Sequence, residues 1–289
     1  MKPVIFQREI FESLVVQRFD FNRNNWIHWR VMIGFCPLAS GSKGNAIFLG
    51  TERTRILIDA GISRTALEKK LSQLSIDLKT IDAILVTHEH TDHIQGLKNL
   101  TEKFNIPVFA NAETAKRICS LLQIRPRFKI FTTGESFEFE DLCIHPFSIP
   151  HDTMDPVAFA IRTQSLKLGF CTDLGYATSL VKKQLEGCDY LYLEANHQPS
   201  MVHASGRPLI YKKRVLGKQG HLSNEDAASL LSSIFHANLK HVHLAHLSSE
   251  CNAPETALKT VHEKLKLICQ SVELSIAFQN EISKPIFFK

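Results

Sequence analysis

Three histidines and an aspartate are crowded into residues 87–93, which read THEHTDH. The apolar run just before them is typical of a buried strand, and imidazole and carboxylate are ligands that zinc, manganese and iron accept. A turn that leaves a strand can aim alternate side chains at one point, so His88 and His90 can share one ion. Asp92 and His93 lie just beyond, placed for a second ion. The alternative is a polar turn with incidental histidines, but such a turn gains nothing from groups that repel when protonated.

Four more residues of ligand type stand where an expected strand ends. They are Asp59, His151, Asp173 and His246. Each is a weak signal alone, because a lone histidine in a loop is more often a surface or core residue. Together with residues 88–93 they form a set that could converge at one edge of two packed sheets.

These residues occur in the order of the five motifs of the metallo-β-lactamase fold superfamily, which the chain resembles from about Ile33 to its last expected strand. The resemblance implies an α+β fold, a four-layer αβ/βα sandwich with a metal site at one edge. The pattern of the chain agrees, because two strand-rich halves with helices between them favour two packed sheets covered by helices.

Carried over position by position, the resemblance implies two divalent metal ions, which could be zinc, manganese or iron. It assigns His88, His90 and His151 to the first ion, and Asp92, His93 and His246 to the second. Asp173 would bridge the ions, and Asp59 would orient the ligands through hydrogen bonds. Two ions about 3.5–4 Å apart can share a hydroxide and lower its pKa toward neutrality. We expect Asp92 and His221 to take direct part in catalysis.

Residues 38–45, LASGSKGN, resemble the opening motif of the YycJ-like (WalJ) branch, and residues 193–197 and 220–224 match two further motifs. Gln198 departs from the pattern, which has aspartate there. The branch implies a metal-dependent nuclease, notably a 5′-to-3′ exonuclease acting on DNA. Secreted lactamases usually carry cysteine at the position of Asp173 and have export signals; neither is present here.

A basic span, residues 203–221, contains no acidic residue and could neutralise phosphates near the metals. From charge alone, a solvated basic loop explains it equally well. His221 is a candidate proton donor to the leaving oxygen or a phosphate contact, and His197 is a candidate orienting or substrate-facing residue. The candidate substrate contacts are Ser42, Lys43, Asn45, Asn196, Lys212, Lys213, Arg214, Lys218, Ser223 and Asn224.

The 289 residues are 44% hydrophobic and 22% charged, with a formal charge of +5, which is ordinary for a soluble globular protein. Seven scattered cysteines without a C-x-x-C pair indicate reduced thiols. No apolar stretch approaches the roughly 20 residues of a membrane span, and no signal-peptide pattern opens the chain, so we expect a cytoplasmic protein. The oligomeric state is not predicted.

Residues 1–31 differ in pattern from the rest of the chain, so we interpret them as an N-terminal extension and residues 32–289 as the hydrolase domain. One hypothesis is that Met32 is the natural start of the protein, and the other is that residues 1–31 include a docked helix.

Residues 197–221 are expected to be a long loop or loose helix. Ser223 should cap a helix over 224–236, with Asp226 three residues on. Two other functions stay open: a small-molecule thioester or lactone hydrolase, and a non-catalytic binding protein.

Overall fold

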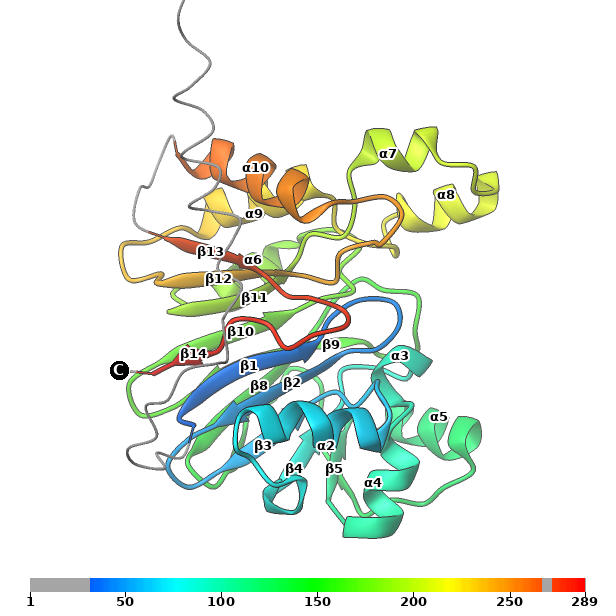
Figure 1. The fold of residues 1–289 in the computed structure, drawn as a ribbon, viewed down its shortest axis with the longest axis vertical. Coiled ribbons are helices and arrows are strands. Elements are labelled where there is room, and N and C mark those ends of the chain that lie inside the picture. Colours follow the sequence, from blue (N-terminus) through cyan, green and yellow to red (C-terminus); the bar gives the residue numbers. More distant parts are fainter. Residues whose placement is uncertain (1–31, 267–271, 289) are drawn as a thin grey trace, which may run out of the picture. The chain divides into compact units, whose positions relative to one another are not determined.

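The computed structural model describes residues 32–266 and 272–288 (Figure 1). The predicted N-terminal extension, residues 1–31, lies outside the described residues. In the part of the chain that the structure describes, no helix has both the length and the apolar character that a membrane span requires.

Two seven-stranded sheets form the centre of the described unit. The first has the order β14-β1-β2-β3-β4-β5-β6, with β14 (Ile286–Phe287), β1 (Gly34–Ala39), β2 (Ala46–Gly50), β3 (Arg55–Ile58), β4 (Ala83–Leu85), β5 (Val108–Ala110) and β6 (Phe128–Ile130). The second has the order β13-β12-β11-β10-β9-β8-β7, with β13 (Glu273–Ile276), β12 (His241–Ala245), β11 (Tyr190–Glu194), β10 (Lys167–Cys171), β9 (Val157–Arg162), β8 (Leu142–Ser148) and β7 (Phe137–Phe139). In each sheet, antiparallel pairs give way to parallel pairs, which run from β3 to β6 and from β10 to β13.

Helices cover the outer face of each sheet (Figure 1). The first sheet is covered by α2 (Arg64–Gln73), α4 (Leu97–Phe104) and α5 (Ala112–Leu122), with the short turns η1 (Leu78–Thr80) and α3 (Thr91–Ile94). The second is covered by α6 (Ser179–Leu185), α9 (Asn224–Ile234) and α10 (Pro254–Leu265). The predicted four-layer αβ/βα sandwich is therefore confirmed.

Three apolar cores hold these layers together, because the central strands of each sheet bury both of their faces. In β3, Ile56 and Ile58 face the core between the two sheets, whereas Leu57 faces the helices of the first sheet. Side chains alternate along a strand, so a strand covered on both faces reads as one continuous apolar run. This is why 55–58 and 83–85 show no polar alternation in the sequence.

Two local expectations can be compared directly with the structure. Ser223 caps α9 as predicted: its hydroxyl accepts a hydrogen bond from Asp226 N at 3.0 Å and donates one to Asp226 Oδ2 at 2.8 Å. The span 197–221 is more regular than expected, because it holds two short helices, α7 (Pro199–Ala204) and α8 (Leu209–Val215). Each starts at or next to a proline, whose fixed φ suits the first helical turn.

Candidate metal centre

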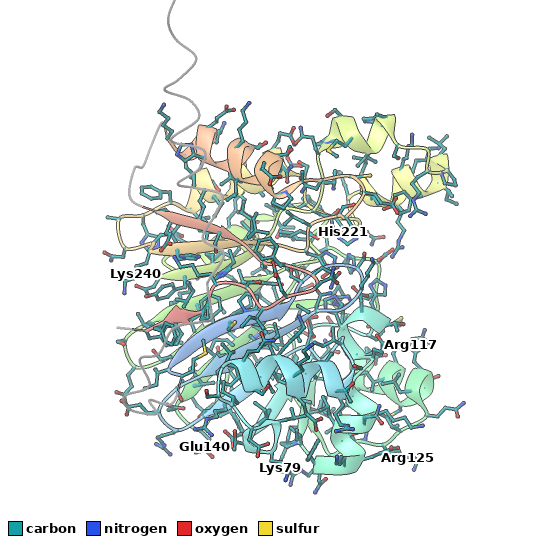
Figure 2. The ribbon with its side chains drawn as sticks, viewed as in Figure 1. Lys79, Arg117, Arg125, Glu140, His221 and Lys240 are labelled. Carbon is teal, nitrogen blue, oxygen red and sulfur yellow. The ribbon has the colours of Figure 1, made fainter. Side chains whose placement is uncertain are left out.

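The predicted ligands lie together at one edge of the sandwich, where strands of both sheets end. Residues 88–93 follow β4 in the first sheet, whereas His151, Asp173 and His246 follow β8, β10 and β12 in the second. Parallel neighbours end at the same edge, which explains how residues so distant in sequence meet. Figure 2 labels His221 in this region, between the α7–α8 segment and the first sheet.

His88, His90 and His151 form the first candidate ligand set, with donor atoms within 4.8 Å of one another. His90 Nδ1 lies 3.2 Å from both His88 Nε2 and His151 Nε2. The ring of His151 has a defined tautomer: Nδ1 lies 3.1 Å from the carbonyl oxygen of Gly220, which can only accept, so Nδ1 carries the hydrogen. The lone pair of His151 Nε2 therefore points into the set.

Asp59 sets the tautomers of two further rings. His93 Nδ1 donates to Asp59 Oδ2 at 2.7 Å. The Thr87 hydroxyl donates its hydrogen to Asp59 Oδ2 at 2.9 Å. Toward His88 Nδ1, which is also 2.9 Å away, the hydroxyl can therefore act only as an acceptor, so His88 Nδ1 carries the hydrogen. The Nε2 atoms of both rings then face the centre, where a metal ion can take the place of any proton that they carry.

Asp92, His93 and His246 form the second candidate ligand set, whose donor atoms also lie within 4.8 Å of one another. Asp173 lies between the sets: Oδ1 is 3.6 Å from His151 Nε2, and Oδ2 is 3.2 Å from His93 Nε2. The carboxylate is 3% exposed, and its Oδ2 has no hydrogen-bond partner among the described residues despite the short distance to His93. His246 Nε2 is also buried, and it lies 3.7 Å from Asp92 Oδ2, beyond hydrogen-bond distance. Buried carboxylate and ring atoms that face one another in this way are costly unless a proton or a metal ion lies between them, so the donor set fits divalent metal ions.

The electrostatics of the second set point the same way. Burial alone would raise the pKa of Asp92, but the neighbouring His93 and His246 rings hold it below its usual range. Burial would lower the pKa of His246, yet the charge of Asp173, the nearby Asp92 carboxylate and the hydrogen bond with Glu194 raise it to about 10. The three carboxylates around His93 likewise outweigh its burial and raise its pKa. Without metal the centre therefore retains protons that a divalent cation would replace.

Three of these residues have a left-handed backbone, which non-glycine residues rarely adopt. The φ angles are +60° at Asp59, +58° at Asp173 and +54° at His246. Each follows a strand, and each such conformation costs about 1–2 kcal/mol. The sharp reversal aims a polar side chain at the centre directly after an apolar strand.

Glu194 is a site residue that sequence reasoning missed, although it lies inside the 193–197 motif. It is completely buried, and its Oε1 accepts from His221 Nδ1 at 2.8 Å and from His246 Nδ1 at 3.0 Å. Its Oε2 accepts from the backbone amides of Leu174 and Leu222, at 2.7 and 3.0 Å. Burial would raise the pKa of Glu194, but the charge of His221 and the hydrogen bonds with His221 and His246 lower it to about 2. Glu194 was inconspicuous because it reads as the end of the apolar strand β11.

Several predicted substrate contacts are buried. The Asn45 amide is 3.1 Å from Asp92 Oδ2 and 3.0 Å from His93 Nε2, and Asn196 donates to the His246 carbonyl oxygen at 2.7 Å. Asn224 is fully buried against Asn252. Asn45 and Asn196 therefore support the segments that carry the candidate ligands. The role of Asn45, Asn196, Asn224 and the buried Ser223 as phosphate contacts stays a prediction, as does the orienting or substrate-facing role of His197, which is also buried.

The remaining predicted contacts are more open. Ser42 and Lys43 lie on an exposed turn, and Lys213 and Lys218 are exposed. The guanidinium of Arg214 is instead paired with Asp152, with Nε 2.6 Å from Oδ2, and the ammonium of Lys212 donates to a backbone carbonyl, that of His203, at 2.7 Å.

Known proteins share both the sequence pattern and the fold of this chain. Residues 54–244 match the model of the β-lactamase superfamily domain. Exodeoxyribonuclease YycJ of Bacillus anthracis is 36% identical over 234 residues, covering 80% of this chain and 89% of that protein. Exodeoxyribonuclease WalJ of Streptococcus pneumoniae is 32% identical over 232 residues, covering 79% and 86%. The metallo-β-lactamase fold protein YhfI of Bacillus subtilis superimposes with a TM-score of 0.65 at 15% identity, covering 86% of this chain and 98% of that one.

Proposed function

The chain belongs to the β-lactamase superfamily as a metal-dependent hydrolase related to YycJ and WalJ, and on this premise we propose that it is a phosphodiesterase acting on DNA, as a 5′-to-3′ exonuclease. The observation that carries the proposal is the pair of three-residue ligand sets with the Asp173 carboxylate between them. The names of the two relatives supply the substrate class.

We assign His88, His90 and His151 to one ion and Asp92, His93 and His246 to another, with Asp173 shared. Two bound divalent ions would supply Lewis acidity to the phosphoryl oxygens and lower the pKa of an attacking water. The chain's own residues prepare this chemistry. Asp59 keeps the ligand rings in the metal-binding tautomer, and Asn45 holds the Asp92 carboxylate in place.

His221 is our candidate for the group that protonates the leaving oxygen. Its ring centroid lies 5.4 Å from that of His151 and 5.2 Å from that of His246, so His221 lies next to one member of each ligand set. Its Nδ1 donates to Glu194, which fixes the ring and leaves Nε2 as the atom that exchanges a proton. Positioned proton transfer of this kind contributes about 10²–10⁴-fold to a rate.

The test is cleavage of 5′-phosphorylated duplex DNA, single-stranded DNA and RNA in the presence of manganese or zinc. Stepwise loss of nucleotides from the 5′ end, absent in Asp92→Ala and Asp173→Ala, supports the proposal. If metal-replete wild-type protein leaves every nucleic acid intact and hydrolyses a thioester or lactone, the small-molecule function replaces it.

A further inference from the structure

The α7–α8 segment, residues 199–215, stands apart from the two helix layers, beside the edge that holds the metal centre (Figure 1). It has a small core of its own, in which Val202 and Val215 pack with Cys251 and against Tyr211. We call this segment the α7–α8 hairpin.

The last turn of α8 is fixed at the rim of the metal centre. Arg214 pairs with Asp152, whose Oδ1 lies 3.6 Å from His90 Nε2 and 3.5 Å from His151 Nε2. Gly220, whose carbonyl oxygen accepts from His151, lies so close to α8 that a Cβ there would be 2.1 Å from the Arg214 carbonyl oxygen. Whatever lies along α8 therefore lies next to the reacting centre.

The outer face of α8 combines apolar and basic side chains. Leu209 is 66% exposed and Ile210 is 80% exposed, which is unusual for adjacent large aliphatic residues. One turn further on, Lys213 is exposed, whereas Lys212 is half-buried and its ammonium donates to the His203 carbonyl oxygen. No acidic side chain of residues 32–266 or 272–288 pairs with either lysine. At 1.5 Å rise per residue, the two pairs are about 5 Å apart, between one and two nucleotide steps of about 3.4 Å along a strand.

We propose that this face of the α7–α8 hairpin binds the unpaired end of a DNA strand, with Lys212 and Lys213 on phosphates and with Leu209 and Ile210 against base faces. The inference rests on the proposed function and specifies its substrate. In a duplex the base faces are stacked on one another, so an apolar pair can reach them only where the strand is single. The surface therefore favours single-stranded or frayed ends over closed duplex.

The test measures binding of metal-replete protein to phosphorothioate DNA, single-stranded and duplex, over a range of salt concentrations. The variants are Leu209→Ser/Ile210→Ser and Lys212→Gln/Lys213→Gln. Helix α6 offers a matched control, because it is also seven residues long with an exposed leucine, Leu180, followed by two exposed lysines. The control variants are Leu180→Ser and Lys182→Gln/Lys183→Gln, and the thermal midpoint and metal content verify that each variant is folded and loaded.

We expect Leu209→Ser/Ile210→Ser to weaken single-strand binding by about ten-fold, the effect of partly burying two aliphatic side chains, with no change in salt dependence or in duplex binding. Lys212→Gln/Lys213→Gln should make the slope of log affinity against log salt shallower by about 1.4 on single strands, at about 0.7 per phosphate contact. The α6 variants should bind like wild type.

Two results would overturn this inference and leave the proposed function standing. In the first, the wild type digests DNA while the α8 variants bind single strands as tightly as the wild type does. In the second, Leu209→Ser/Ile210→Ser abolishes self-association of the protein and leaves its DNA affinity unchanged. If the wild type neither binds nor digests any DNA, the proposed function fails, and the inference falls with it.

Discussion

Replacing Glu194 by glutamine exchanges one carboxylate oxygen for an NH₂ group at a completely buried position of the centre. Glu194 accepts four hydrogen bonds, two from ring nitrogens and two from backbone amides. Glutamine can turn its single oxygen toward only one of these pairs. The backbone amides cannot change, so the NH₂ group must face His221 and His246.

That orientation reverses the tautomer of both rings. With an N–H donor opposite Nδ1, each neutral ring moves its hydrogen to Nε2, and His246 loses the lone pair that we assign to the second ion. Changes to groups that orient metal ligands typically cost 10–100-fold in metal affinity. If metal is restored in excess, the loss of two charge-assisted hydrogen bonds, about 1 kcal/mol each relative to neutral ones, still slows the reaction by about 30-fold.

Two substrates separate these effects. DNA releases an alkoxide, which needs a proton, whereas bis(p-nitrophenyl) phosphate releases a phenolate, which does not. At saturating metal, Glu194→Gln should therefore slow DNA cleavage far more than cleavage of the activated diester. Glu186→Gln, at an exposed position, is the matched control. Metal affinity and DNA cleavage both within two-fold of wild type would refute the reasoning about Glu194.

Three other outcomes are expected. Removing the metal with a chelator should lower the thermal midpoint measured by calorimetry by about 5–10 °C per ion. An ion whose free concentration is 100 times its dissociation constant stabilises the fold by about 2.7 kcal/mol, which gives this shift. An unchanged midpoint would contradict the fit of the donor set to metal. Asp173→Asn should keep the fold by circular dichroism and hold fewer ions by mass spectrometry, and full occupancy would remove Asp173 from the ligand set. The pKa of His241 is lowered in the fold from 6.5 to about 4, chiefly by burial, so the unfolded chain binds more protons and stability is lost as pH falls from about 6.5. Urea unfolding at pH 7.5 and 5 should show that His241→Gln removes about 2 kcal/mol of this loss; equal losses in both proteins would show that His241 does not titrate as stated.

The buried strands before the candidate ligands, the helix that Ser223 caps and the candidate ligand residues themselves could be predicted, because each shows a local pattern in the sequence. The histidine and aspartate content of residues 88–93 indicates a metal site, and the continuous apolar runs at residues 55–58 and 83–85 indicate buried strands. The membership of the chain in the superfamily, predicted from the order of its motifs, is confirmed by the comparisons.

What could not be predicted depends on contacts between distant segments. Glu194 looks like the end of an apolar strand, and only the fold brings His221 and His246 onto its carboxylate. Asn45 looked like a solvent-facing turn residue, but its turn packs against the backbone of residue 92, which buries it. The pairing of Arg214 with Asp152 could not be predicted either, because the two residues are 62 positions apart in the sequence and meet only in the fold.

Each ligand set draws its members from both sheets, and this has a consequence for how the protein acquires its metal. A chain synthesised from its N-terminus presents His88, His90, Asp92 and His93 long before His246 exists. A nascent or half-folded chain can therefore hold an ion only loosely, with an incomplete shell that other cellular ligands can strip. Secure retention begins when the last strands of the second sheet are in place. Metal occupancy in a purified sample would then report how many molecules completed their fold, and unloaded molecules would be concentrated among those that never docked their second half.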